Sequence, residues 1–132
     1  MTSLRAVTLR LFEELRDESV DLDAAHVVAP STLEEAAAIL AAAAEAGIPT
    51  AVRGSGTHRG HGNPASADLV ITTTRLDAIV DWQPDDLTVV VQAGVPIDLL
   101  EAEIATRRQT AVLPETTPGS TVGGAVAVGL SS

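Results

Sequence analysis

The chain has 132 residues, with 18 acidic against eight basic side chains and a formal net charge of −10. All the basic residues are arginines, and one Phe and one Trp are its only aromatic side chains. A basic surface for phosphate backbones and stacking platforms for bases are therefore lacking, which excludes nucleic acid as a partner. The absence of cysteine excludes disulfides and thiolate metal sites and fits a cytoplasmic location. No apolar run approaches the ~20 residues of a membrane span.

The N-terminal region predicts an amphipathic helix over residues 4–18. Its apolar residues recur at spacings of three and four, with acidic residues between them: Leu4, Val7, Leu11 and Leu15. The polar residues 17–23 read as a linker. We therefore expect residues 1–24 to form a helix and a linker, followed by one domain over residues 25–132.

The next segment predicts a strand and a capped helix. HVVAP at 26–30 is a short strand ended by proline. In S-T-L-E, Ser31 and Glu34 have the spacing of a capping box, which starts an alanine-rich helix over 33–46. Gly47 then ends this helix.

The remaining elements alternate between strands and a helix. IPTAVRG at 48–54 and DLVITTT at 68–74 are strands, and residues 78–94 form a hairpin with Pro84 in its turn. Asp85 and Asp86 are explained by turn chemistry rather than by a metal. A helix begins at Pro96, with Leu99, Leu100 and Ile104 as its core stripe. This order predicts an α+β (α/β-like) domain, a small mixed sheet flanked by helices.

A glycine-rich stretch, VRGSGTHRGHG at 52–62, follows the second strand directly. Glycines let consecutive backbone N–H groups converge on an anion, Ser55 and Thr57 add hydroxyls, and Arg53 and Arg59 add positive charge. The P-loop pattern requires a lysine, which the chain lacks. The Rossmann pattern G-x-G-x-x-G does not fit the spacing of Gly54, Gly56 and Gly60, nor the turn-like residues that follow.

Two other interpretations of this stretch compete with phosphate binding. His58 and His61 suggest a metal, but their spacing in an irregular loop defines no shared face, and no third ligand is placed near them. A solvated surface connection is the other alternative. Local chemistry alone does not separate that connection from a phosphate site.

Three ordered stretches together resemble the FAD-binding domain of the vanillyl-alcohol oxidase and p-cresol methylhydroxylase (PCMH) superfamily. They are AHVVAPSTLEEAAAILAAAAEAGIPTAVRGSGTHRGHG, RLDAIVDWQPDDLTVVVQAGVPIDLLEAEIATRRQTAVLPE and PGSTVGGAVAVGLSS, and they cover about residues 25–132. The nearest likeness is to the FAD-binding subunit of glycolate oxidase. The resemblance implies the N-terminal subdomain of a PCMH-type FAD-binding domain, truncated at its C-terminal side.

The resemblance also implies which residues contact the cofactor, in two segments. The first, which we call the glycine loop (residues 53–60), would wrap the FAD diphosphate, and the second (residues 118–124) would lie beside the flavin, where a helix start would offer free N–H groups. Taken alone, Gly123 and Gly124 would instead indicate a tight turn or close packing of small residues. Thr57 aligns with the histidine that some relatives use for covalent attachment, so noncovalent FAD is expected. The implied contacts are Arg53, Gly54, Ser55, Gly56, Thr57, His58, Gly60, Pro118, Gly119, Ser120, Thr121, Gly123 and Gly124.

The expected function is the N-terminal FAD-binding portion of an FAD-linked oxidoreductase that oxidises a 2-hydroxy acid by hydride transfer to flavin. The chain ends eight residues after Gly124, so we expect the substrate domain to be absent and the apolar AVAVGL segment to favour a partner chain or self-association. No catalytic acid, base or nucleophile is identified, and His26 is expected to be structural. The alternative is a noncatalytic module that keeps the fold as a structural or interaction domain.

Overall fold

The computed structural model describes residues 26–57, 66–113 and 117–129. The chain divides into two compact units. The first contains the described residues 26–53 and 66–75, and the second contains 54–57, 76–113 and 117–129. The expected helix at 4–18 lies outside the described residues. Among those described, no helix is long and apolar enough to cross a membrane.

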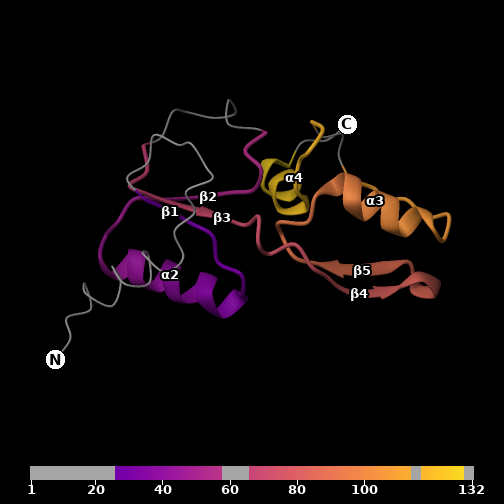
Figure 1. Cartoon of the computed structure of the whole chain (residues 1–132), viewed down its shortest axis with the longest axis horizontal. Coiled ribbons are helices and arrows are strands. Elements are labelled where there is room, and N and C mark those ends of the chain that lie inside the picture. The colour runs from indigo at the N-terminus through magenta and orange to yellow at the C-terminus, as the bar shows by residue number, and fades with distance from the viewer. Residues whose placement is uncertain (1–25, 58–65, 114–116, 130–132) are drawn as a thin grey trace. The chain divides into compact units, whose positions relative to one another are not determined.

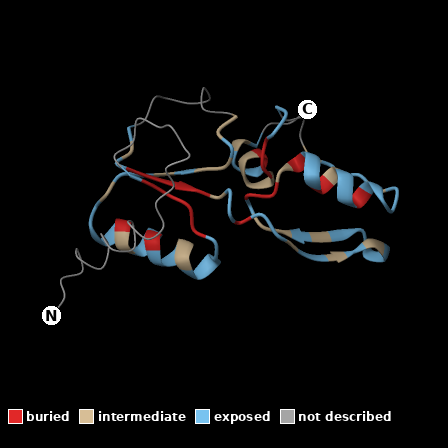
Figure 2. Ribbon diagram, in the orientation of Figure 1, coloured by how far each residue is buried: buried red, intermediate tan, exposed pale blue. Residues whose placement is uncertain are grey.

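The first unit is a three-stranded parallel sheet with one helix (Figure 1). Strands β1 (His26–Val28) and β2 (Thr50–Arg53) both pair with β3 (Leu69–Thr72), which lies between them. Helix α2 (Leu33–Glu45) connects β1 to β2. All four residues of β3 are buried, as expected for the central strand of a parallel sheet (Figure 2).

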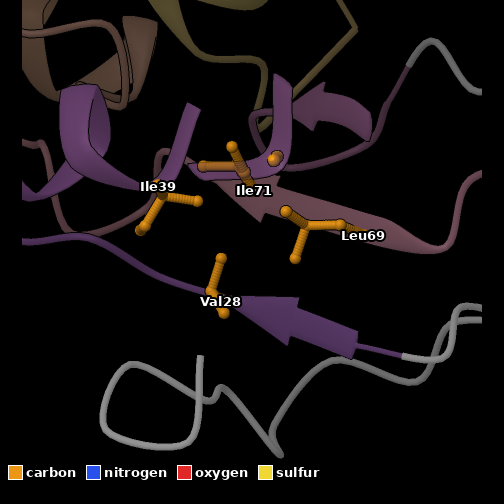
Figure 3. Packing of buried hydrophobic residues seen from close by; sticks show 5 residues of the cluster. Val28, Ile39, Leu69 and Ile71 are labelled. Atoms are coloured by element: carbon orange, nitrogen blue, oxygen red, sulfur yellow. The ribbon is translucent and has the colours of Figure 1, made fainter. Parts of the chain in front are cut away.

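One apolar cluster joins the sheet of the first unit to α2 (Figure 3). Leu69 and Ile71 lie two apart on β3 and therefore share a face, where Val28 of β1 and Ile39 of α2 meet them. Ala43 completes this buried cluster, one turn along the helix from Ile39. The core of this unit thus consists of small aliphatic side chains.

The capping box of α2 lies one residue later than predicted. The N-cap is Thr32, whose hydroxyl accepts a hydrogen bond from the Glu35 N–H at 3.1 Å. The Glu35 carboxylate in turn accepts bonds from the N–H groups of Ser31, at 2.7 Å, and Thr32, at 3.3 Å. The prediction of Ser31 and Glu34 was wrong because S-T-L-E-E contains two overlapping boxes, and the helix that begins at Leu33 uses the second.

The second unit combines an antiparallel hairpin with two helices (Figure 1). Strands β4 (Ile79–Gln83) and β5 (Thr88–Val91) are joined by the 3-10 turn η1 (Pro84–Asp86), which confirms the predicted hairpin. Helix α3 spans Ile97–Ala105 and helix α4 spans Val122–Val128. The predicted α+β class is confirmed, but the described strands form one parallel and one antiparallel sheet rather than the single mixed sheet that was predicted.

The core of the second unit contains Val95, Leu100 and Ile104. The prediction that Leu99 belongs to the core stripe was wrong, because Leu99 is 51% exposed and Ile97 is buried in its place. Positions 97, 100 and 104 share one helical face through spacings of three and four, whereas 99 lies off it. Both strands of the hairpin lack fully buried residues (Figure 2).

Candidate cofactor site

The described part of the glycine loop follows β2 as an irregular segment. Arg53 is the last residue of β2, and its carbonyl accepts a hydrogen bond from the Thr73 N–H at 2.9 Å. Gly56 has φ +81°, a conformation that favours glycine. Among the described residues, no hydrogen bond uses the N–H groups of Gly54, Ser55 or Gly56. These three consecutive donors are the site's main capacity for an anion.

The second segment is held by three residues near the start of α3. Thr121 forms an antiparallel bridge with Pro96, and the Ile97 N–H donates to the Ser120 carbonyl at 2.9 Å. The Asp98 carboxylate accepts from the N–H of Gly119, which has φ +82°, at 3.3 Å. Asp98 was missed by the sequence reasoning because it lies 21 residues from Gly119 and no local pattern links them. The segment is therefore fixed by long-range contacts.

The two predicted segments meet within the second unit. The hydroxyl oxygens of Thr57 and Ser120 are 2.9 Å apart, a hydrogen-bond distance. Gly54 lies against the side chain of Thr121, where a Cβ on Gly54 would collide with the threonine hydroxyl. Ser120 and Thr121 are both buried. Residues some 63 positions apart, assigned to one site from the sequence, thus lie side by side.

Helix α4 begins where a helix start was expected, but its first N–H groups already have acceptors. Val122 donates to the Val95 carbonyl at 2.9 Å, and Gly123 donates to the Ala93 carbonyl at 2.8 Å. Gly124 donates to the hydroxyl of the N-cap Thr121 at 3.2 Å. The expectation of free donors for an anion was therefore wrong, because neighbouring carbonyls and the cap satisfy the donors that a helix start otherwise leaves open.

The glycines of the two segments have different structural roles. An ideal Cβ on Gly123 would lie 2.7 Å from the Ala93 Cβ and 2.8 Å from the Ala93 carbonyl oxygen, so Gly123 permits close packing. A Cβ on Gly124 would lie 3.1 Å from the Thr121 hydroxyl oxygen, a tight contact. Close packing, one of the two alternatives left open for this pair, explains Gly123.

The structure says less about three other predicted cofactor contacts, Pro118, His58 and Gly60. Pro118 is exposed in the turn before Ser120, and His58 and Gly60 lie outside the described residues. In the part of the chain that the structure describes, no group of three or more His, Asp or Glu residues could hold a metal ion. The described part of the predicted cofactor site thus consists of Arg53–Thr57 and residues 118–124.

A separate apolar groove of about 720 Å³ lies in the second unit, along the hairpin and α3. Trp82, Val89, Ile104 and Leu113 are among its lining residues. None of the residues assigned to the cofactor lines it. The groove and the candidate cofactor site are thus different surfaces of this unit.

Comparison with known proteins decides the family. Residues 24–132 match the family described as FAD binding domain. The chain belongs to this family. The FAD binding domain match confirms the PCMH-type resemblance seen in the sequence and supports FAD as the ligand.

Two curated relatives of this FAD binding domain come from Mycobacterium tuberculosis, strains CDC 1551 and H37Rv, and each is named an uncharacterized FAD-linked oxidoreductase. Each is 35% identical over 82 residues, which are 61% of this chain and 18% of the relative. The chain therefore spans less than a fifth of the curated relatives that it matches.

Solved structures show the same fold at low sequence identity. An alkyldihydroxyacetonephosphate synthase matches with a TM-score of 0.71 and 19% identity, over 98% of this chain and 26% of that one. GilR, an oxidoreductase of gilvocarcin biosynthesis, matches at 0.62 and 24%, over 86% and 24% of the two chains. A carbohydrate oxidase from Microdochium nivale matches at 0.64 and 14%, over 75% and 21%.

Proposed function

We propose that this chain binds FAD noncovalently and holds the diphosphate against the glycine loop. The observation that carries this proposal is the row of N–H groups at Gly54, Ser55 and Gly56, which no described residue uses. Backbone donors in a glycine-rich turn form a concave site for anions, with no need for lysine. The loop sits beside the second segment through Thr57 and Ser120, in a chain of the FAD binding domain family.

Each group of the site has a distinct proposed role. The N–H groups of Gly54–Gly56 would donate to diphosphate oxygens, and the exposed Ser55 hydroxyl would add one more donor. Arg53 would offset part of the diphosphate charge in a chain whose net charge is −10. Bound FAD supplies the hydride-accepting chemistry, whereas these residues supply binding and orientation.

For the whole protein we propose an FAD-linked oxidoreductase that oxidises a 2-hydroxy acid. The names of the two mycobacterial relatives support the reaction class. The substrate class rests on the resemblance to the FAD-binding subunit of glycolate oxidase. No catalytic acid or base is assigned in this chain. A partner chain or self-association is proposed from the apolar composition of the AVAVGL segment. A cytoplasmic location remains a prediction from the absence of cysteine.

A titration with two flavins tests the binding proposal. The purified chain, shown to be folded by circular dichroism, is titrated with FAD and with riboflavin, and flavin fluorescence is followed. Saturable binding of FAD with much weaker binding of riboflavin is expected, because riboflavin lacks the diphosphate. If flavin fluorescence shows no saturable change on addition of FAD, the proposal is contradicted. Acid precipitation of the complex should leave the flavin in the supernatant, and flavin retained in the pellet would contradict noncovalent binding.

The substrate proposal needs the assembled protein. The whole protein that contains residues 1–132, loaded with FAD, is supplied with glycolate or lactate and an artificial electron acceptor. Reduction of the acceptor that depends on FAD and on the 2-hydroxy acid is expected. An FAD-loaded assembly that reduces the acceptor with none of these acids would overturn the substrate class.

A further inference from the structure

A chain of two hydrogen bonds, formed by two hydroxyl groups and one carbonyl, connects the glycine loop to the second segment. Thr57 Oγ1 lies 2.9 Å from Ser120 Oγ, and Ser120 Oγ lies 2.6 Å from the carbonyl oxygen of Thr117. The Ser120 side chain is 1% exposed, which makes it one of the most buried polar groups in the described residues. The connection is therefore centred on a buried side chain, between the half-buried Thr57 and the exposed Thr117.

The direction of these hydrogen bonds follows from the chemistry of the three groups. A carbonyl oxygen only accepts, and Ser120 has a single hydroxyl proton, so that proton lies between Ser120 and Thr117. Ser120 must then accept at its oxygen in the other bond. Thr57 is the donor of that bond. Its proton is directed into the protein rather than toward a ligand.

This direction separates Thr57 from the groups that can bind a diphosphate. Diphosphate oxygens accept hydrogen bonds and so require donors, and the Thr57 hydroxyl proton already has an acceptor in Ser120. The N–H groups of Gly54, Ser55 and Gly56 have no acceptor among the described residues. Donation to the ligand is thus assigned to the backbone of the loop.

We propose that Thr57 and Ser120 are positioning residues, which hold the glycine loop through two linked hydrogen bonds, from Thr57 to Ser120 and from Ser120 to Thr117, and do not themselves donate to the diphosphate. This inference rests on the proposed FAD-binding function and refines the roles assigned to both residues. The loop contains Gly56 at φ +81°, and two of its five described residues are glycines, so it has much conformational freedom to lose on binding. A loop that is already ordered in the free protein loses less conformational freedom when the ligand binds.

The first test needs no flavin. Order parameters of the Gly54, Ser55 and Gly56 amides are measured by ¹⁵N relaxation in the free chain and in three variants. Thr57→Val removes the hydroxyl and keeps the side-chain shape, Ser120→Ala removes the acceptor, and Thr57→Ser keeps a hydroxyl. Lower order parameters are expected in Thr57→Val and Ser120→Ala, with wild-type values in Thr57→Ser. Unchanged order parameters in both Thr57→Val and Ser120→Ala would overturn the proposal. If Ser120→Ala does not fold, the comparison of Thr57→Val with Thr57→Ser decides alone.

The second test asks whether the two residues act through one another. Each single variant is expected to weaken FAD binding by about threefold to tenfold, the range of one ordinary hydrogen bond. The double variant Thr57→Val/Ser120→Ala is expected to bind no more weakly than the weaker single variant, because both remove the same bond. Losses that multiply would contradict the proposal and indicate direct contact with FAD. A wild-type chain that fails to bind FAD would instead contradict the proposed function, while the relaxation data still decide the positioning role.

Discussion

Gly54 lies so close to Thr121 that any side chain on Gly54 would displace the threonine hydroxyl. An ideal Cβ at Gly54 would lie 3.1 Å from Thr121 Cγ2 and 3.2 Å from its Cβ, and it would collide with Oγ1. That same Oγ1 accepts the hydrogen bond of the Gly124 N–H and so caps α4. The glycine loop and the start of α4 are therefore joined by contact as well as by the bond between Thr57 and Ser120.

The change Gly54→Ala is expected to destabilise the second unit. The added methyl group meets a side chain that is 3% exposed, so Thr121 must move and its capping bond to Gly124 weakens. Overpacking of this kind costs about 1–3 kcal/mol. Urea unfolding measures the loss, and Gly124→Ala is the matched control, since its Cβ would sit 3.1 Å from the same oxygen and alanine favours a helix. Equal stability of Gly54→Ala and wild type would refute the contact.

The change Gly123→Ala is expected to destabilise the chain although it lies within a helix. Alanine gains about 1 kcal/mol of helix propensity over glycine. Against this, its Cβ would lie 2.7 Å from the Ala93 Cβ and 2.8 Å from the Ala93 carbonyl oxygen, which accepts the Gly123 N–H. Thermal unfolding should show a net loss. Adding Ala93→Gly should recover only part of it, because the backbone oxygen remains, and full recovery would show that the carbonyl contact is unimportant.

The change Leu87→Gly is expected to stabilise the hairpin. Leu87 follows η1 with φ +56°, a left-handed conformation that is unfavourable for a branched side chain, and 78% of it is exposed. Glycine adopts this conformation without the cost of about 1–2 kcal/mol that other residues carry. A net gain of about 0.5–1 kcal/mol in the free energy of unfolding is expected after glycine's own entropy cost. Leu87→Ala is the control and should give no such gain; a loss in Leu87→Gly would contradict the backbone argument.

Acid should weaken the N-terminal cap of α2. Hydrogen bonds from Ser31, with smaller contributions from Thr32 and the charge of Arg75, lower the pKa of Glu35 below its ordinary value of 4.5. A lowered pKa in the folded state means that the stabilisation is present above pH 4.5 and is lost as the pH falls through the lower folded-state value. Unfolding of wild type and Glu35→Gln is compared from pH 6 to about pH 3. The difference in the free energy of unfolding between wild type and Glu35→Gln should shrink as the pH falls. A difference that stays constant would exclude the Glu35 carboxylate as its source.

Local sequence patterns predicted most elements of this chain. They failed where the sequence was compatible with two alternative caps or two alternative buried faces. The hairpin, β1–β3 and both described long helices follow from strand propensity, turn residues and capping residues. In S-T-L-E-E, Ser31 and Thr32 are both capping residues and Glu34 and Glu35 are both acids, so the sequence permits two boxes. Likewise, α3 carries enough aliphatic residues for two candidate stripes, and only packing against Val95 selects the one with Leu100 and Ile104.

The cofactor segments were predicted by resemblance, but the contacts that join them were not. The Thr57–Ser120 bond, the Asp98–Gly119 bond and the packing of Gly123 on Ala93 connect residues far apart in the chain. No periodicity or turn rule relates such positions. These contacts also decide which groups remain available to a ligand, so the role of each glycine could be read only from the structure.

The change Gly56→Ala is expected to weaken FAD binding, whereas Gly47→Ala is not. Both glycines have positive φ, +81° and +65°, so alanine introduces backbone strain at each. Gly47 follows α2 in the first unit, and an ideal Cβ there meets nothing within 4 Å. Strain at Gly56 instead alters the loop whose N–H groups at Gly54, Ser55 and Gly56 are proposed to bind the diphosphate.

Fluorescence titration with FAD measures the dissociation constant of both variants, and urea unfolding measures their stability. A conformational penalty of about 1–2 kcal/mol corresponds to about a fivefold to thirtyfold weaker dissociation constant for Gly56→Ala. Gly47→Ala should lose stability and keep the wild-type dissociation constant. If both variants bind FAD as wild type does, the loop is not the diphosphate site; if both bind it equally weakly, the effect reflects global stability rather than the loop.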